Sequence, residues 1–147
     1  MQPTKETSMG KVTTTIEITN RIDQANAANG IISQDEIRSV TLNNVLVDTG
    51  ATTLCLPKNI IAQLGLSLLR EVVVETATGI TKANIFRDAS VSLLGREGTF
   101  ECLELPEGST VLLGVVPLEM LGIEIDLKNQ TLNVLPDSTA ETYLTIL

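Results

Sequence analysis

The sequence predicts a mainly β domain, a small closed β-barrel or sandwich that carries one or two short helices. Three observations support this fold class. The chain has 147 residues, which is the length of one domain with a real core. Its composition is 43% hydrophobic but only 2% aromatic, so Val, Ile and Leu must build the core, and this favours strands over clusters of rings. Short apolar segments also alternate with turn signals about every ten residues, a pattern typical of barrels and sandwiches.

The chain divides into three parts by composition. Residues 1–11 are polar and are expected to form a flexible leader. Residues 12–136 carry the strand and turn pattern, and we expect them to form a single domain. Residues 137–147 form a C-terminal tail that ends in the apolar sequence YLTIL, which suits either a last core strand or a strand at a dimer interface.

In the first half of the domain, the sequence pattern predicts a strand, then an irregular surface segment, and then further strands and a helix. At residues 12–18, Val12, Thr14, Ile16 and Ile18 fall on one face, which is the period of a half-buried strand. Residues 23–36 are rich in Asn, Ala, Gln and Gly and predict a surface excursion with room for a helical turn. Residues 39–47 and 53–56 return to strand character. Residues 57–65 begin with proline and end with glycine, as a short helix does at its first position and its end.

The next segments predict a hairpin and two further strands. Residues 68–75 and 80–86 flank the turn candidate 76–79 and together predict a β-hairpin. Two more strands are expected at residues 90–94 and 99–105, on either side of the glycine-bounded turn GREG.

The last part of the domain predicts a buried strand, a short helix and a final hairpin. Residues 111–114 read VLLG and suit a buried strand. Residues 117–121 are expected to form a short helix that Gly122 closes. Residues 123–136 predict a hairpin around the turn Lys128-Asn129-Gln130.

Charge and composition exclude several classes of function. The net charge is −8 and no basic run occurs, so no basic face is available for nucleic acid. The chain has no histidine, which excludes Ser-His-Asp and Cys-His catalysis and leaves few candidate ligands for a zinc site. No apolar run approaches the ~18 residues that span a bilayer, and we expect no membrane partner, no metal and no cofactor. The two cysteines, Cys55 and Cys102, have no CxxC spacing and suit buried free thiols in a reducing cytoplasm.

The most informative segment is VLVDTGATTLCLP, residues 45–57, which places an aspartate inside an apolar stretch. Burying an ionised carboxylate without compensation costs several kcal/mol, so ordinary cores avoid it. The carboxylate of Asp48 is therefore either heavily hydrogen-bonded or placed there for chemistry.

This segment resembles the active-site loop of aspartic proteases, in the DTGA form of the retropepsin-like, retroviral-type family. Two other segments agree with that family in order and spacing, and the resemblance covers roughly residues 12–136. They are the glycine-bearing hairpin, which resembles the family's flap, and a hydrophobic-hydrophobic-glycine motif. The residues that carry the resemblance are Asp48, Thr49, Gly50 and Ala51 in the loop, Thr76, Ala77, Thr78, Gly79 and Ile80 in the flap, and Leu112, Leu113 and Gly114 in the motif.

The resemblance implies an aspartic endopeptidase, which hydrolyses a peptide bond without a covalent intermediate. One carboxylate takes a proton from water while a second, protonated carboxyl donates a proton to the carbonyl oxygen. Two negative charges about 4 Å apart repel by ~4 kcal/mol at an effective dielectric near 20, or about three pKa units, so the pair shares one proton.

Only one Asp-Thr-Gly sequence occurs in the chain. None of the other aspartates is followed by Thr-Gly or Ser-Gly; they are Asp23, Asp35, Asp88, Asp126 and Asp137. We therefore expect the catalytic pair to form in a homodimer, with Asp48 of each chain on the two-fold axis and a peptide or protein as substrate. In the family, the threonine that matches Thr49 bonds across to the other copy, and interleaved termini hold the dimer, a role for which residues 143–147 are suited.

The sequence also departs from the viral pattern and leaves alternatives open. Viral members carry an arginine and an Asn or Asp after the motif, whereas here Val115-Val116-Pro117 follows, and the excursion at 23–36 has no viral counterpart, which suggests a cellular, bacterial-looking branch. A non-catalytic peptide-binding or dimerisation module could keep the same groove. A metal site that uses Asp48 and Glu75 ranks last, because the acids follow no calcium-loop spacing.

Overall fold

A computed structural model of the chain describes residues 11–136, in which seven strands form one sheet and two form a second. The large sheet has the order β1-β2-β7-β3-β6-β5-β4, and β8 pairs with β9 alone. The strands are β1 (Val12–Asn20), β2 (Ser39–Val47), β3 (Leu54–Pro57), β4 (Ser67–Thr76), β5 (Gly79–Leu93), β6 (Arg96–Leu105), β7 (Leu112–Leu113), β8 (Ile123–Asp126) and β9 (Thr131–Val134). The helices are α2 (Arg21–Ala28), the 3₁₀ turn η1 (Gln34–Glu36), α3 (Lys58–Leu64) and α4 (Val115–Leu121).

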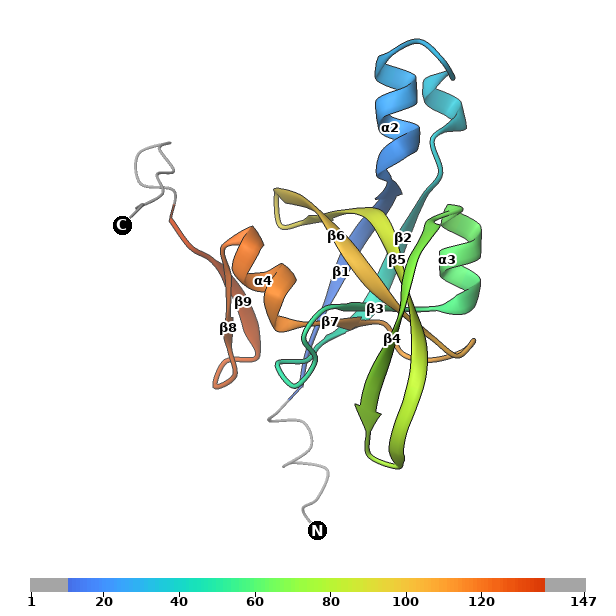
Figure 1. Ribbon diagram of the computed structural model, residues 1–147. Coiled ribbons are helices and arrows are strands. Elements are labelled where there is room, and N and C mark those ends of the chain that lie inside the picture. Colours follow the sequence, from blue (N-terminus) through green and yellow to red (C-terminus); the bar gives the residue numbers. More distant parts are fainter. Residues whose placement is uncertain (1–10, 137–147) are drawn as a thin grey trace, which may run out of the picture.

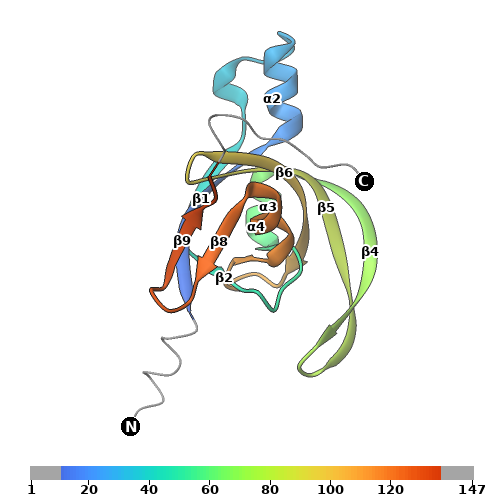
Figure 2. The same cartoon turned by 90° about the vertical axis from the view of Figure 1, so that its left-hand side faces the viewer.

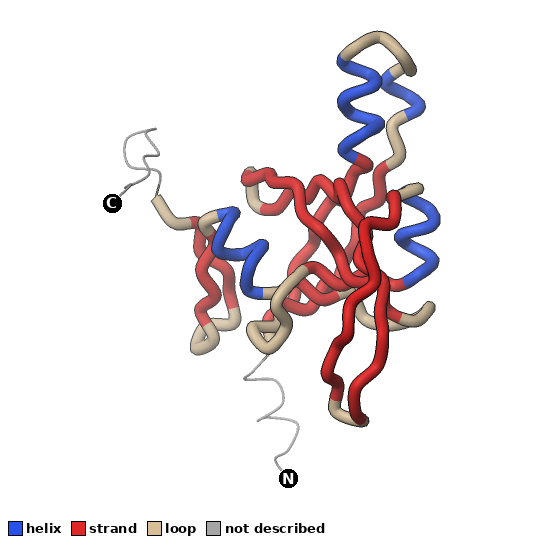
Figure 3. The backbone as a smooth tube through the Cα atoms, in the orientation of Figure 1, coloured by secondary structure: helices blue, strands red, loops and turns tan. Residues whose placement is uncertain are grey.

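The large sheet closes on itself, which confirms the predicted mainly β, closed-barrel fold class. Strand β1 pairs with β2 on one edge and with β5 on the other, so β1, β2, β7, β3, β6 and β5 form a ring. Strand β4 lies outside the ring and pairs only with β5, so the β4–β5 hairpin projects from the barrel (Figures 1 and 3). Closure removes the free edges from the ring and leaves the long β4–β5 hairpin as the element that projects from it.

Aliphatic side chains fill the barrel, as the composition predicts. The residues with the least exposure include Ile16, Ile18, Leu54 and Leu113, each at 1% or less, and Phe100 is the one aromatic side chain among the buried core residues at 11–136. Burial of each such aliphatic side chain stabilises the fold by about 1.5–3 kcal/mol before entropy is counted. The core is continuous from β1 to β8 and fixes the strand ends from which the loops emerge.

Several predicted elements are present with nearly the expected bounds. Strand β2 begins and ends where the pattern predicts, at residues 39–47. The helix predicted at 57–65 is α3, which Gly65 ends in the left-handed conformation at φ 64°. Its proline precedes the helix as the N-cap residue and does not occupy the first turn. The predicted final hairpin is present as β8–β9, in which Ile125 pairs with Leu132.

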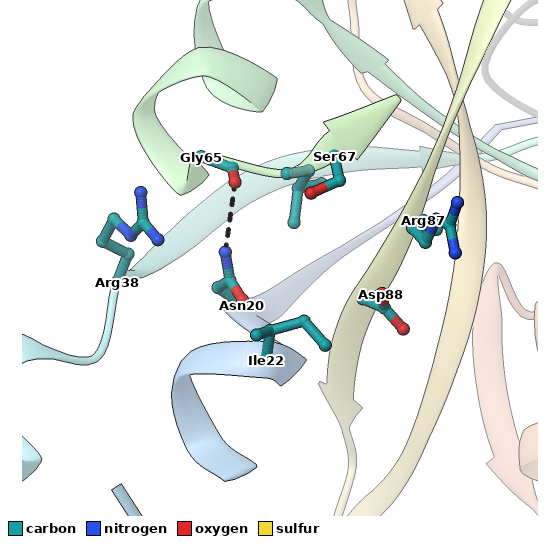
Figure 4. Close-up of a pocket in the computed structure, with 8 residues that line it drawn as sticks. Asn20, Ile22, Arg38, Gly65, Ser67, Arg87 and Asp88 are labelled. Carbon is teal, nitrogen blue, oxygen red and sulfur yellow. Dashed lines mark hydrogen bonds between the residues drawn. The ribbon is translucent and has the colours of Figure 1, made fainter. Parts of the chain in front are cut away.

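The segment predicted as a surface excursion with room for a helical turn, residues 23–36, contains more helix than that, because α2 begins at Arg21 and runs to Ala28 and η1 follows. The Asn20 side chain caps α2 by accepting a hydrogen bond from the Asp23 N–H at 3.0 Å. The buried Asp23 carboxylate accepts bonds from the Arg38 backbone N–H and guanidinium, each at 2.9 Å, and the Arg38 hydrogen bonds lower the pKa of Asp23. The Asn20 amide also donates to the carbonyls of Leu64 and Gly65, which ties α2 to α3 at the edge of a small pocket (Figure 4).

The two strands predicted on either side of Arg87 and Asp88 are a single strand, β5. Its register with β6 shifts between Phe86 and Ala89, and Asp88 has φ 65°, which are the marks of a β-bulge. The following turn is also shorter than predicted. Leu94 and Gly95, at φ 51° and 81°, suffice to reverse the chain, because positive φ at both residues matches the twist of a two-residue hairpin turn.

The predicted leader, apart from Lys11, and the predicted C-terminal tail lie outside the described residues. Within residues 11–136, no helix has the length and apolar character needed to cross a membrane. The family motifs singled out above all lie inside the described part of the chain.

Candidate active site

Asp48 follows directly after the last residue of β2, at one end of the barrel. Val47 is buried and pairs with Leu113 of β7 in a parallel register. The ladder continues one step further, because the Asp48 N–H donates to the Leu113 carbonyl at 3.0 Å. Asp48 is half-buried and Thr49 is exposed beside it. The strand end therefore fixes the backbone of Asp48 while its carboxyl stays within reach of solvent.

The DTGA loop turns tightly around the Asp48 carboxylate. The Gly50 N–H donates to Asp48 Oδ1 at 2.8 Å, and the Ala51 N–H donates to the Asp48 carbonyl at 3.0 Å. A Cβ on Gly50 would lie 3.1 Å from Asp48 Oδ1, which is tighter than ordinary contact. The φ angle of Gly50 is not positive, so the glycine serves to leave room beside the carboxylate and not to allow a left-handed turn.

The hydrophobic-hydrophobic-glycine motif packs against the other side of this loop. Leu112 and Leu113 form β7, and Gly114 caps α4. A Cβ on Gly114 would lie 2.5 Å from the Thr53 carbonyl oxygen and 2.6 Å from that of Ala51. Those distances leave no space for a side chain. The motif begins 61 residues after Ala51 in the sequence and is nevertheless the loop's direct neighbour in the fold.

The first turn of α4 is hydrogen-bonded to the loop. The Val115 N–H donates to the Ala51 carbonyl, and the Val116 N–H donates to the Thr52 carbonyl, both at 3.0 Å. At the far end of the loop, the Thr53 hydroxyl donates to the Glu101 carbonyl of β6 at 3.1 Å. The loop is therefore held by β7, α4 and β6 together.

A groove of about 900 Å³ lies between this loop and the β4–β5 hairpin. Residues 50–53 and Cys55 of β3 form one wall, the hairpin forms the second, and the end of β6 with the following proline forms the third. Asp48 and Thr49 come just before the first wall and are not among the lining residues. Its lining residues are 50–53, 55, 72–76, 78–83, 85 and 103–106. The volume is in the range of sites that hold small molecules or short peptide segments.

The hairpin has an inner and an outer face. Val72 and Val74 are half-buried, whereas Val73 and Ile80 are 68% and 73% exposed. This alternation follows from the period of two in a strand. All four residues line the groove, and the half-buried Val72 and Val74 offer the more enclosed apolar contacts to a chain lying in it.

The hairpin turn holds four of the five predicted flap residues beside the groove. Thr76, Thr78, Gly79 and Ile80 line it, while Ala77 at the turn is not among the lining residues. The Thr76 hydroxyl donates to the Gly79 carbonyl at 2.8 Å, and the Thr78 N–H donates to the same hydroxyl at 3.3 Å. The side chain of Thr76 thus stabilises the turn at the hairpin tip.

Cys55 also lines the groove, a position that its interpretation as a core thiol did not indicate. In the parallel β3–β6 ladder Cys55 pairs with Leu103 and Cys102 with Leu54, so the two thiols point to opposite faces of the sheet. Both are free and buried. Burial, and then the charge of Asp48, raises the pKa of Cys55 to about 11.

The end of β6 is the second part of the site that sequence reasoning missed. Residues 103–106 enter the wall of the groove because β6 runs parallel to β3, and no local pattern encodes that pairing. The run Val72-Val73-Val74 predicts a strand but has no alternation of apolar and polar residues, so the sequence does not indicate which face of the hairpin is the more buried. Among residues 11–136, no group of three His, Cys, Asp or Glu side chains is placed to hold a metal ion.

A closed β-barrel that presents an Asp-Thr-Gly loop opposite a long hairpin defines a retropepsin-like aspartic protease fold. A model of the family described as gag-polyprotein putative aspartyl protease matches residues 34–120. The match runs from η1 to α4 and includes the loop, the hairpin and the Leu-Leu-Gly motif. The chain belongs to this aspartyl protease family. No curated protein matches it.

Proposed function

We propose that the chain is a homodimeric aspartic endopeptidase in which Asp48 of each subunit supplies one of two catalytic carboxyls. The observation that carries this proposal is that the half-buried Asp48 begins a hydrogen-bonded loop whose following residues, 50–53, line the groove under the hairpin. Family membership supports the reaction class. The single Asp-Thr-Gly sequence supports the sharing of the site between two chains.

The pair of carboxyls performs general acid and base catalysis on a water molecule. One carboxylate takes a proton from the water as its oxygen bonds to the scissile carbonyl carbon, and the protonated partner gives its proton to the carbonyl oxygen. When the tetrahedral intermediate collapses, the C–N bond breaks and the leaving nitrogen takes a proton from the pair. The second hydroxyl of the intermediate returns a proton as the new carbonyl forms. The pair ends with one proton, as it began.

The substrate is an extended peptide that lies between the loop and the hairpin. A strand-like peptide can form backbone hydrogen bonds with a sheet edge, which is a general mode of peptide recognition. The inner hairpin residues Val72 and Val74, with Leu103 and Leu105 opposite, line the groove with apolar side chains. Cleavage next to apolar residues is the specificity that follows.

The cytoplasm is the proposed compartment. Cys55 and Cys102 are free thiols on opposite faces of the sheet, so the fold does not depend on a bridge between them. A fold that keeps its cysteines apart is suited to a reducing environment.

Peptide cleavage tests the proposal directly. The wild-type protein, Asp48→Asn and the control Asp35→Asn are incubated with a diverse peptide mixture at several pH values, and mass spectrometry identifies the products. Asp35 is an exposed residue of η1, so its substitution keeps the charge change but leaves the loop intact. We expect cleavage by wild type and Asp35→Asn, and a loss of roughly 10³-fold or more for Asp48→Asn.

Equal cleavage by wild type and Asp48→Asn would refute the proposal. A wild-type protein that binds peptides but cleaves none would instead identify a non-catalytic peptide-binding module with the same groove. Mixing wild type with an equal amount of Asp48→Asn tests the shared site, because random pairing leaves only about one quarter of dimers with two intact chains. Activity per wild-type chain should then fall to about half.

A further inference from the structure

A polar pocket of about 400 Å³ lies between the start of α2 and the barrel, apart from the groove under the hairpin. Figures 1 and 2 place α2 at one end of the barrel, while the tip of the β4–β5 hairpin points to the other. The two cavities have no lining residue in common. The lining residues of this second pocket are Arg21 and Gln24 of α2, Ser90 of β5, and Glu97, Gly98 and Thr99 of β6.

The floor of the pocket belongs to a row of hydroxyl side chains that crosses four strands. Ser39 of β2 pairs with Thr19 of β1, and Thr19 pairs with Ser90 of β5. Ser90 pairs in turn with Thr99 of β6. Side chains that are directly opposite in antiparallel strands lie on the same face of the sheet. The residues before and after Ser90 belong to the hydrophobic core, so Ser90 lies on the other face, where α2 packs against β5.

The two halves of this row differ in their hydrogen bonds. The hydroxyls of Thr19 and Ser39 bond to each other at 3.0 Å. Ser90 is only 5% exposed, yet within residues 11–136 its hydroxyl makes no hydrogen bond. Buried polar groups nearly always have a partner, because leaving one without a partner costs free energy. The hydroxyl of Ser90 is therefore placed to bond a molecule that occupies the pocket.

Two opposite charges border the same pocket without pairing. Arg21 belongs to α2 and Glu97 to β6, and within the described part of the chain neither side chain takes part in an ion pair or a hydrogen bond. The amide of Gln24 and the hydroxyl of Thr99 can each donate and accept. A simple anion would be attracted by Arg21 and repelled by Glu97, and a simple cation the reverse. A molecule that carries both charges satisfies both side chains.

We propose that this pocket binds a small zwitterion with a carboxylate and an ammonium group, as an α-amino acid or a short peptide has. The carboxylate accepts hydrogen bonds from the Arg21 guanidinium and the Ser90 hydroxyl, and the ammonium group donates to the Glu97 carboxylate. No aliphatic or aromatic side chain lines the pocket, so the rest of the ligand is small or polar. This site is independent of Asp48 and gives a role to α2, which the proposed protease chemistry does not use.

NMR titration of the isotope-labelled full chain tests the inference. The probes are glycine, L-serine, L-asparagine and L-glutamine, and the backbone amide signals of Ser90, Gly98 and Thr99 are followed. We expect saturable shifts with at least one probe, at a dissociation constant of about 1 mM, because the pocket is open and offers two charge-assisted contacts. The N-acetyl derivative of that probe lacks the ammonium group and its amide derivative lacks the carboxylate, so each should bind roughly tenfold more weakly or worse.

Variants of the lining residues locate the binding. Arg21→Gln and Glu97→Gln should each raise the dissociation constant by roughly tenfold or more, and Ser90→Ala by a few fold. The matched control is Arg87→Gln, because Arg87 is an exposed residue of β5 that does not line this pocket. It should bind the probe as wild type does. Circular dichroism verifies that each variant is folded.

Each outcome supports or overturns the inference. If no probe gives saturable shifts, and glycylglycine and triglycine give none either, the pocket holds water only and the inference is overturned. Equal binding of the N-acetyl derivative identifies an anion site, and equal binding of the amide derivative a cation site; either result overturns the zwitterion. Binding that persists unchanged in Arg21→Gln and Glu97→Gln lies elsewhere and overturns the site. Tighter binding of glycylglycine or triglycine than of the amino acids supports the site and identifies a peptide as its ligand.

Discussion

Replacement of Gly114 by alanine separates two reasons for a glycine at this position. Gly114 has φ −86° and ψ −176°, an extended conformation that any residue adopts. If backbone preference alone mattered, alanine would stabilise the fold by about 0.4–1 kcal/mol through the unfolded state. The structure predicts the opposite sign, because the added Cβ would lie 2.5 Å from Thr53 O and 2.6 Å from Ala51 O.

The magnitude follows from the shift that the loop must make. Moving the Ala51 carbonyl from 2.6 Å to an ordinary contact near 3.4 Å displaces it by about 0.8 Å. Such overpacking costs about 1–3 kcal/mol, and a displacement near 1 Å in a catalytic loop can reduce the rate by about 10²-fold. Urea unfolding should therefore show a midpoint lower by roughly 1 M, if the slope is about 2 kcal/mol/M.

The control for this experiment is Gly30→Ala. Gly30 has φ 75° and nothing within 4 Å of an added Cβ, so alanine there costs about 1 kcal/mol of backbone strain without a clash. Peptide cleavage by Gly30→Ala should equal that of wild type when both are folded. If Gly114→Ala keeps wild-type stability and wild-type cleavage, the close approach of Gly114 to the loop does not constrain the site.

Two further predictions concern the base of α2 and the thiols. Asp23→Ala should lower the free energy of unfolding by about 2 kcal/mol, because the half-exposed Arg38 keeps part of its hydration, and Asp35→Asn should have no effect. Because Arg38 lowers the pKa of Asp23 in the fold, this contribution to the free energy of unfolding is complete above pH 4 and is lost as pH falls below it. If the free energies of unfolding of wild type and Asp23→Ala fall in parallel during acid titration, this prediction is wrong. Burial raises the pKa of Cys55 to about 11 and the pKa of Cys102 to about 12. Neither thiol should therefore react with a disulfide reagent at pH 8 before the protein unfolds. Rapid labelling of the native protein would contradict this and would show that the thiols are accessible.

Local patterns predicted most of the fold, and contacts between distant segments account for the rest. The alternation at residues 12–18 and the Gly65 helix end were sufficient, because strand period and left-handed glycine caps depend on neighbours in sequence. The continuity of β5 through Asp88 was not readable, since pairing with β6 rather than local propensity carries the strand through its bulge. The helix α2 was underestimated for a similar reason, because Asp23 and Arg38 stabilise it from outside.

The same division applies to the candidate site. The Asp48 loop, the hairpin and Leu113-Gly114 were found because each carries its own short motif. Cys55 and the end of β6 carry none, and they join the groove only through the parallel pairing of β3 with β6. Sequence reasoning therefore found the loop and the hairpin that border the groove, but missed the part of its wall that Cys55 and the end of β6 supply.

The position of Asp48 explains how a charged residue can interrupt an apolar segment. Its neighbour Val47 is buried, but Asp48 lies one step beyond the strand, half-buried, with an N–H donor at 2.8 Å from its carboxylate. The free-energy cost of burying an ionised carboxylate, which the sequence led us to expect, is thus largely avoided in the single chain. The loop is already fixed by Leu113 and by the close packing of Gly114, so little backbone entropy is left to lose when a second copy approaches. In the proposed homodimer, this prior order would lower the entropic cost of bringing the two Asp48 loops together.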